Sequence, residues 1–168
     1  RFIEGVVGDQ YDTRHKLENL SSIDNWMLAK LQQSTKKIGD LIEDYRFSEA
    51  YDTLYHTLWD DIADWYIEAS KSNANVGVLA HILETVLKLA HPFAPFVTET
   101  IWQTLKWEDE PLLITSTWPK VTTLTAEQTR TAEEFEIIKS VVTEARVIVT
   151  ALDLAKPHLY FKESALLR

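Results

Sequence analysis

The stretch SSIDNWMLAKLQQSTKKIGDLIEDY, residues 21–45, decides the fold. Its apolar residues recur at steps of three and four, which is the spacing of one face of an α-helix. Ser22 is the expected N-cap, and Asp24 stands where a negative charge favours a helix N-terminus. At about 1.5 Å per residue, roughly 23 helical residues reach about 35 Å. The segment therefore predicts one long amphipathic helix. The stripe consists of Ile23, Met27, Leu31, Ser34, Ile38, Leu41 and Tyr45, and Ser34 is its one small polar member.

The composition supports the same fold class over the whole chain. Of 168 residues, 45% are hydrophobic, while only four are Gly and five are Pro. So few turn-forming residues favour long helices over a sandwich or barrel. We expect an all-α protein, a bundle of four to five long antiparallel helices with a short extended C-terminal segment. The whole of 1–168 is expected to form a single domain, with a core bundle over about 21–152 and a tail over 153–168.

Local signals place the second and third helices. A break at residues 45–47 separates the first helix from a second, which Ser48 could cap and which runs to about Ser70. Asn75 opens a third helix, which ends before Pro92 because proline disfavours helix in the residue before it. This third helix is apolar nearly all round, so we expect it at the bundle centre. The second helix should bury Phe47, Tyr51, Leu54, Leu58, Ile62 and Trp65.

Similar signals place the later elements. Pro95 can begin a fourth helix, where its missing N–H costs nothing. Thr125 and Gln128 have capping-box spacing for a fifth helix to about Leu152. This fifth helix should pack through Phe135, Ile138, Val142, Ala145 and Val149. The alternation over 158–161 predicts a short strand.

Charge and cysteine content exclude several classes of function. Cysteine is absent, so no disulfide framework, zinc ribbon or cysteine nucleophile is possible. The net charge of −9 disfavours nucleic-acid binding over the whole surface. Residues 1–40 nevertheless balance six basic against six acidic residues, whereas residues 41–70 hold eight acidic and one basic. A neutral N-terminal region could therefore meet RNA while the acidic segment faces away. No apolar run is long enough to span a membrane.

Candidate catalytic and metal-binding patterns are weak. The chain has no Gly-rich phosphate loop, no G-x-S-x-G and no H-E-x-x-H. His56 follows Asp52 by four residues and Glu84 follows His81 by three, but a di-metal bundle needs a repeated set. We expect no catalytic residue and no metal site. The carboxylates Asp60, Asp61 and Asp64 should form a solvated face, and the aromatic residues Trp59, Trp65 and Tyr66 should belong to the core.

Several motifs occur together in a recognisable order. Asp24-Asn25-Trp26-Met27-Leu28 resembles a "D-R-W-I-L" helix start, and Tyr45-Arg46-Phe47 resembles a "Y-R-F" break. Residues 58–68, LWDDIADWYIE, are similar to "W-D-E-F-C-D-W-Y-L-E". Residues 91–103, HPFAPFVTETIWQ, are similar to "H-P-F-M-P-F-I-T-E-E-I-W-Q", and Trp118-Pro119 sits at the place of a "W-P". These are the motifs of the anticodon-binding bundle of class I aminoacyl-tRNA synthetases, and their form is closest to the valyl branch.

The resemblance implies recognition of tRNA without chemistry. The bundle would grip the anticodon stem-loop of the tRNA for valine and position it for a catalytic domain of the same polypeptide. The family's HIGH and KMSKS motifs are missing, so ATP and valine would bind that other domain, and no cofactor is expected here. Arg1 as the first residue suggests a start inside a longer protein. A monomeric, cytoplasmic parent enzyme, an ATP-dependent valine-tRNA ligase, is expected, with no membrane partner.

The resemblance also nominates contact residues. Trp26 would be either a stacking platform or a cap over the helix end. Asn25 replaces a family Arg, and Arg46 would either touch RNA or pair with the acidic second helix. The full set of candidate tRNA-binding residues is Arg1, Lys16, Asn25, Trp26, Lys30 and Arg46. Phe93, Phe96 and Trp102 should fill the core. The alternatives are the equivalent domain of an isoleucyl or leucyl enzyme, a helical protein-interaction module without RNA binding, or a metal-binding helical enzyme.

Overall fold

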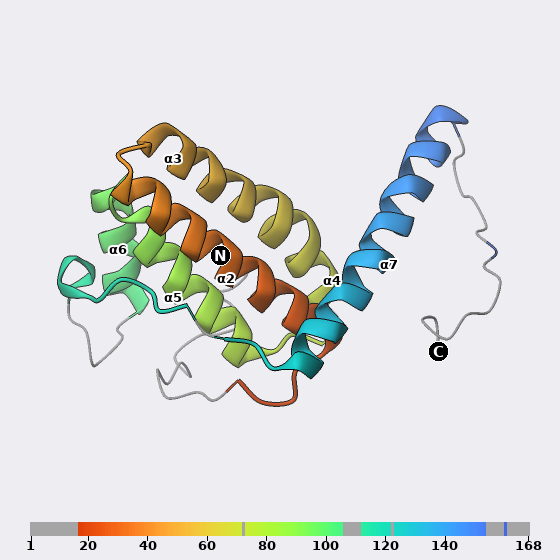
Figure 1. The fold of residues 1–168 in the computed structure, drawn as a ribbon, viewed down its shortest axis with the longest axis horizontal. Helices are drawn as coiled ribbons and strands as arrows, with labels where there is room; N and C mark the ends of the chain where they lie inside the picture. The colour runs from red at the N-terminus through yellow and green to blue at the C-terminus, as the bar shows by residue number, and fades with distance from the viewer. Residues whose placement is uncertain (1–16, 72, 106–111, 122, 154–159, 161–168) are drawn as a thin grey trace.

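The computed structural model of the chain describes residues 17–71, 73–105, 112–121, 123–153 and 160. Within these residues every regular element is helical, which confirms the all-α prediction (Figure 1). The strand predicted over 158–161 lies outside the described residues, apart from Tyr160. The elements are α2 (Ser22–Glu43), α3 (Phe47–His56), the π-helical stretch η2 (Thr57–Ile67), α4 (Glu68–Ser70), α5 (Val76–Ala90), α6 (Pro95–Leu105), the short 3-10 turn η3 (Leu113–Thr115) and α7 (Ala126–Ala151).

Helix α2 begins with a capping box. Ser21, not Ser22, is the N-cap, because the Ser21 side chain accepts from the Asp24 backbone N–H. In return the Asp24 carboxylate accepts from the Ser21 backbone N–H at 2.9 Å. The same carboxylate also accepts from the Tyr66 hydroxyl at 2.7 Å. A buried acidic residue thus caps α2 and ties it to η2.

Helix α2 ends in a Schellman motif. The Arg46 N–H donates to Leu41 O at 2.8 Å, and the Tyr45 N–H donates to Ile42 O at 3.0 Å. This motif needs a residue with positive φ, and Tyr45 has φ 61°. Tyr45 therefore lies outside the helix and is 81% exposed, rather than continuing the apolar stripe as predicted.

Residues 47–70 form one continuous helix through α3, η2 and α4. Ser48 does not cap it, since Arg46 occupies the N-cap position without a side-chain bond. The buried positions are Ala50, Leu54, Thr57, Ile62, Tyr66 and Ser70. Thr57 and Ile62 are successive buried positions five residues apart, and both lie in η2. In this π-helical stretch the hydrogen bonds join residues i and i+5, so one turn takes about one residue more than in an α-helix. Phe47 and Tyr51, predicted as buried, are 51% and 54% exposed.

Helices α5 and α6 follow the predicted boundaries. The Asn75 side chain caps α5 by accepting from the Val78 N–H at 3.2 Å, and Pro95 is the first residue of α6. Trp102 is buried as expected, whereas Phe96 is 86% exposed and does not fill the core.

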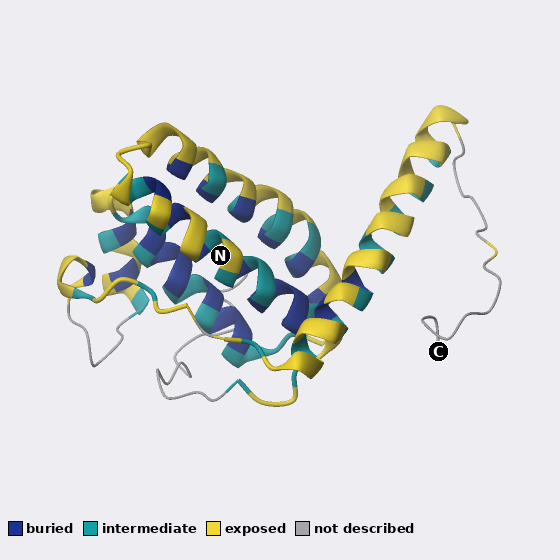
Figure 2. Cartoon of the chain, viewed as in Figure 1, coloured by how far each residue is buried: buried dark blue, intermediate teal, exposed yellow. Residues whose placement is uncertain are grey.

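Every residue of α5 is buried or half-buried, in agreement with the central place predicted for the third helix. Helix α2 shares that central place. It contacts α3, η2, α5 and α7, while α5 packs between α2 and α6 (Figure 1). The buried side chains concentrate on the sides of these helices that face one another (Figure 2). The largest cluster includes Trp26, Met27, Leu31, Ile62, Tyr66, Leu79, Ile82 and Phe135.

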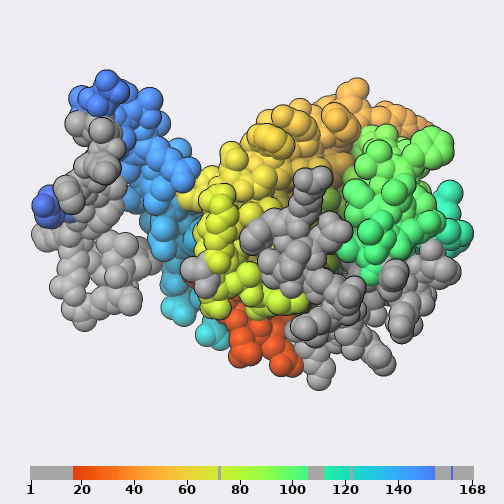
Figure 3. Space-filling model, turned by 180° about the vertical axis from the view of Figure 1, so that it is seen from behind, coloured from red at the N-terminus to blue at the C-terminus, as the bar shows by residue number. Residues whose placement is uncertain are grey.

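Helix α7 starts with the predicted Thr125–Gln128 capping box and packs against the start of α2. Its buried residues are only Ala132 and Phe135. Arg146 still lies 5.0 Å from the Trp65 ring, and the last turns of α7 stand away from the bundle (Figures 1 and 3). Ile138, Val142, Ala145 and Val149 are half-buried rather than core. No helix in the described part of the chain is long and apolar enough to cross a membrane.

Candidate nucleic-acid interface

The six predicted contact residues do not form one cluster. Arg1 and Lys16 lie outside the described residues. Asn25, Trp26 and Lys30 lie in the first part of α2, where α7 packs. Arg46 follows the other end of α2, which is roughly 20 Å from Lys30 at 1.5 Å per residue. The structure therefore brings together three of the six.

Trp26 is a core residue in this structure, which favours a structural role over a stacking platform. It is 1% exposed, and its ring lies 5.3 Å from the ring of Phe135. The indole N–H donates to the Glu136 carboxylate, and Lys139 Nζ lies 4.7 Å from the ring centroid. A base could stack on Trp26 only if α7 moved away.

Asn25 is also covered by α7, so its side chain is not accessible to RNA in this conformation. It is 6% exposed, and its Nδ2 donates to Thr131 Oγ1 at 2.9 Å. Asn25 Oδ1 has no hydrogen-bond partner in the described structure. An unpaired buried oxygen of this kind costs on the order of 1–3 kcal/mol.

Lys30 lies at the edge of the contact between α2 and α7 and is partly exposed to solvent. Its Nζ lies 3.2 Å from Glu136 Oε2, and its side chain is 28% exposed. Burial alone would raise the pKa of Glu136, but the hydrogen bond from Trp26 and the charge of Lys30 outweigh it and lower that pKa. Glu136 is therefore a carboxylate that holds both α2 residues against α7.

Arg46 pairs with the acidic second helix, which is the alternative that the sequence left open. Its Nε lies 2.7 Å from Glu49 Oε1, and a second guanidinium nitrogen bonds the other carboxylate oxygen. The Arg46 side chain is 53% exposed. Exposed pairs are worth at most about 1 kcal/mol, so a phosphate could compete for this cation.

Two adjoining hollows run along the outer face of α2, beside α3. One of about 270 Å³ includes Lys30, Gln33 and Lys37 in its lining, and the next, of about 410 Å³, is lined by Lys36, Lys37 and Arg46 among others. Among the described residues, Lys36 and Lys37 make no ion pair, and both are exposed. We call the two hollows together the α2–α3 groove. Positions 30, 33 and 37 share one helical face, so this spacing could have added Lys37 to the predicted contact residues beside Lys30.

The α2–α3 groove is close to electrically neutral. Its cations Lys30, Lys36, Lys37 and Arg46 face the carboxylates Asp40, Asp44, Glu49, Asp52 and Asp61. His56 also lines it, and a hydrogen bond with Asp60 raises the pKa of His56. A groove with this charge can hold phosphates weakly and in a salt-dependent way, but it has no strong anion site.

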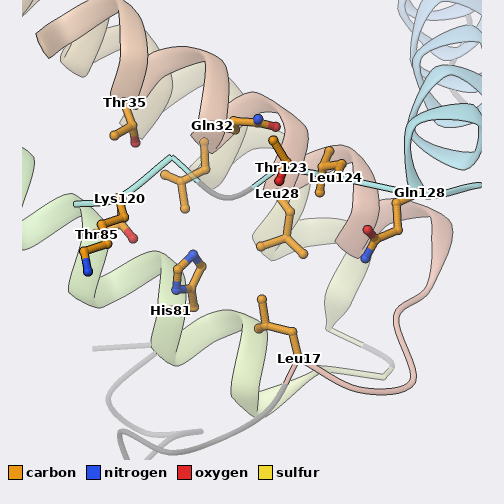
Figure 4. Close-up of a pocket in the computed structure, with 11 residues that line it drawn as sticks. Leu17, Leu28, Gln32, Thr35, His81, Thr85, Lys120, Thr123, Leu124 and Gln128 are labelled. Carbon is orange, nitrogen blue, oxygen red and sulfur yellow. The ribbon is translucent and has the colours of Figure 1, made fainter. Parts of the chain in front are cut away.

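A separate cavity lies on the opposite side of α2, toward α5. Figure 4 shows Leu28 and Gln32 from α2 facing His81 and Thr85 from α5. Its volume is about 60 Å³. Burial lowers the pKa of His81, so this side chain behaves as part of the interior.

The acidic and aromatic residues of η2 that the sequence analysis singled out can now be placed in the fold. Lys139 Nζ lies 3.1 Å from Asp61 Oδ1, so Asp61 joins η2 to α7 instead of forming a freely solvated face. Tyr66 is buried as expected, Trp65 is half-buried, and Trp59 is 59% exposed, contrary to its expected core position. In the described residues, no group of three His, Asp or Glu side chains is arranged to hold a metal ion.

Comparison with known proteins supplies the family. Residues 24–159 match the family described as the anticodon-binding domain of tRNA ligase. The chain is similar to valine–tRNA ligase of Staphylococcus carnosus, with 37% identity over 158 residues, which is 86% of this chain and 18% of that protein. It is 35% identical to valine–tRNA ligase of Thermotoga maritima over 145 residues, covering 82% and 16% of the two chains. The chain thus spans less than a fifth of the length of these curated relatives, and the family match extends from the start of α2 past the end of α7. The chain belongs to the family of anticodon-binding domains of tRNA ligases.

Proposed function

We propose that this chain is the part of a valine–tRNA ligase that binds the anticodon stem-loop of the tRNA for valine. The observation that carries the proposal is the family match over residues 24–159, together with valine–tRNA ligases as relatives at 35% and 37% identity. The parent enzyme would join valine to this tRNA at the expense of ATP. ATP and valine would bind a catalytic domain of the same polypeptide, and we propose a monomeric, cytoplasmic parent.

The α2–α3 groove is the surface best suited to the RNA backbone. Lys36 and Lys37 are exposed, and among the described residues neither forms an ion pair. Within the described part of the chain, the Arg46 guanidinium is held by an exposed pair with Glu49, which a phosphate could replace. Contacts of this kind position the RNA, whereas unpaired loop bases would be read by polar edges and aromatic faces.

The charge of the groove sets the expected strength of binding. Because carboxylates nearly match its cations, the chain alone should bind RNA with a dissociation constant no tighter than about micromolar at physiological salt. The remaining affinity of the parent would come from contacts elsewhere on the tRNA. Nanomolar binding by residues 1–168 alone would contradict this reasoning.

The test is a titration of the chain with the tRNA for valine and with a non-cognate tRNA, each at two salt concentrations. We expect weak binding that falls at the higher salt and favours the valine tRNA. Equal affinity for the two tRNAs would refute the valine assignment and leave general RNA binding. Absence of binding at low salt would refute the groove as a phosphate-binding surface.

A further inference from the structure

The outer face of α3 and the start of η2 carries a row of exposed aromatic side chains. Phe47, Tyr51, Tyr55 and Trp59 follow one another at steps of four residues, so they lie on one side of the helix. They are 51%, 54%, 48% and 59% exposed. The rings of Tyr55 and Trp59 are nearly parallel, with centroids 6.4 Å apart. A continuous exposed aromatic surface of this kind is uncommon on a protein with no partner there.

The row continues onto the corner between α5 and α6. The Tyr51 ring meets the Phe93 ring edge-on at 5.7 Å. Phe93 was predicted to lie in the core and is half-buried against the cluster of Leu41 and Leu54. We call the exposed Phe47, Tyr51, Tyr55 and Trp59, together with Phe93, the aromatic face. At its far end, the Tyr45 ring lies 6.2 Å from the Phe47 ring. The aromatic face therefore spans the second long helix from its first residue to η2.

Apart from Arg46, which directly precedes Phe47, the charges along the aromatic face are negative and disfavour the RNA backbone as its partner. Residues 47–70 contain no Lys or Arg. Asp52 and Asp60 border the row on one side, with 72% and 55% of their side chains exposed. Aromatic rings could stack on bases, but the adjoining carboxylates would repel the phosphates. The complementary partner is a protein segment that combines apolar side chains with Lys or Arg.

The aromatic face and the α2–α3 groove occupy neighbouring sides of α3 and share a border at Asp52. The groove is lined from this helix by Glu49, Asp52, Thr53 and His56, whereas the inward side buries Ala50 and Leu54. A segment docked on the aromatic face would border the groove without filling it. RNA and protein could then be bound at the same time, and the two surfaces can be tested separately.

We infer that the aromatic face is the docking surface for a basic, apolar-faced segment of the parent polypeptide that lies outside residues 1–168. This inference rests on the proposed function, since relatives of this chain are more than five times its matched length. The docked segment buries the aromatic row, and its cations pair with Asp52 and Asp60. Docking there holds the bundle in a defined orientation relative to the remainder of the enzyme.

The experiment is photo-crosslinking in the full-length parent protein. A benzoylphenylalanine replaces Tyr55 in one variant and Trp59 in a second, and the crosslinked peptides are identified by mass spectrometry. Lys71, whose side chain is 53% exposed at the end of α4, is the matched control position. We expect both aromatic-face positions to crosslink within the same polypeptide to one Lys/Arg-containing segment outside residues 1–168, and the control position not to reach that segment.

Other outcomes overturn the inference. Crosslinks to a second copy of the protein would make the aromatic face a self-association surface, and crosslinks to added tRNA would make it an RNA surface. No crosslink from either position would mean that the face is solvated. Binding of valine tRNA by the same samples is measured in parallel, so failure of the proposed function is seen separately from failure of the docking.

Discussion

Replacement of Trp26 by Ala tests whether Trp26 is a core residue or a residue that stacks on RNA bases. The indole is 1% exposed and packs on Phe135, so the change leaves a cavity at the junction of α2 and α7. It also removes the hydrogen bond to Glu136 and the ring beneath Lys139 Nζ at 4.7 Å. Truncation of a buried Trp costs about 3–5 kcal/mol, and the lost polar contacts place this site toward the upper end.

The predicted loss is large relative to the stability of a domain of this size, which is on the order of 5–15 kcal/mol. With a urea m-value of about 2 kcal/mol per molar, a loss of about 4 kcal/mol lowers the unfolding midpoint by about 2 M. The assay is urea unfolding followed by far-UV circular dichroism. Trp59→Ala is the matched control, because the same residue type is 59% exposed there and its loss should cost less than about 1 kcal/mol.

The opposite pattern would refute this reasoning. If Trp26→Ala unfolded at the same urea concentration as the unmodified chain but lost tRNA binding, Trp26 would be an accessible platform and its packing under α7 would be wrong. If Trp59→Ala proved as destabilising as Trp26→Ala, the contrast between core and surface would be wrong.

Three further changes test other parts of the structure. Tyr66→Phe removes the hydroxyl that donates to buried Asp24 at 2.7 Å, so unfolding in urea should show a loss of about 1–3 kcal/mol, and an unchanged midpoint would contradict the bond. Tyr45→Gly removes a side chain from a residue with φ 61°, and we expect a gain of about 0.5–1 kcal/mol in thermal unfolding, whereas a loss would show that the ring is stabilising. The hydrogen bond with Asp60 raises the pKa of His56, so Asp60→Asn should lower that pKa in an NMR titration. Because the folded-state pKa is the higher one, the stabilisation from His56 is complete below its unfolded-state pKa and disappears as the pH rises through the folded-state pKa. An unchanged His56 pKa in Asp60→Asn would contradict the pair.

Helix boundaries were predictable because they depend on neighbouring residues. The cap at Asn75, the start at Pro95 and the capping box of Thr125 and Gln128 are all as predicted. Each involves groups within a few residues of one another, so the signal is present in a short window of sequence. Ser48 failed as a cap because the Schellman turn places Arg46 at that position instead.

The candidate contact residues were less predictable because their exposure depends on distant contacts. The partners of Asn25 and Trp26 are Thr131 and Glu136, separated from them by 106 and 110 residues along the chain. No short-range sequence pattern predicts that α7 packs against the start of α2. Helical spacing also led to the wrong prediction that Trp59 lies in the core. Trp59 instead belongs to an exposed row of aromatic residues spaced four apart.

The most direct test of the account is the salt dependence of binding between the chain and the anticodon stem-loop of valine tRNA. The slope of the logarithm of the association constant against the logarithm of salt concentration is measured for the unmodified chain, Lys37→Ala and Lys71→Ala. We predict that Lys37→Ala makes the slope shallower by about 0.7–1, the loss of one phosphate contact, while Lys71→Ala leaves it unchanged. An unchanged slope for Lys37→Ala, or an equal reduction for Lys71→Ala, would contradict binding of the RNA backbone in the α2–α3 groove.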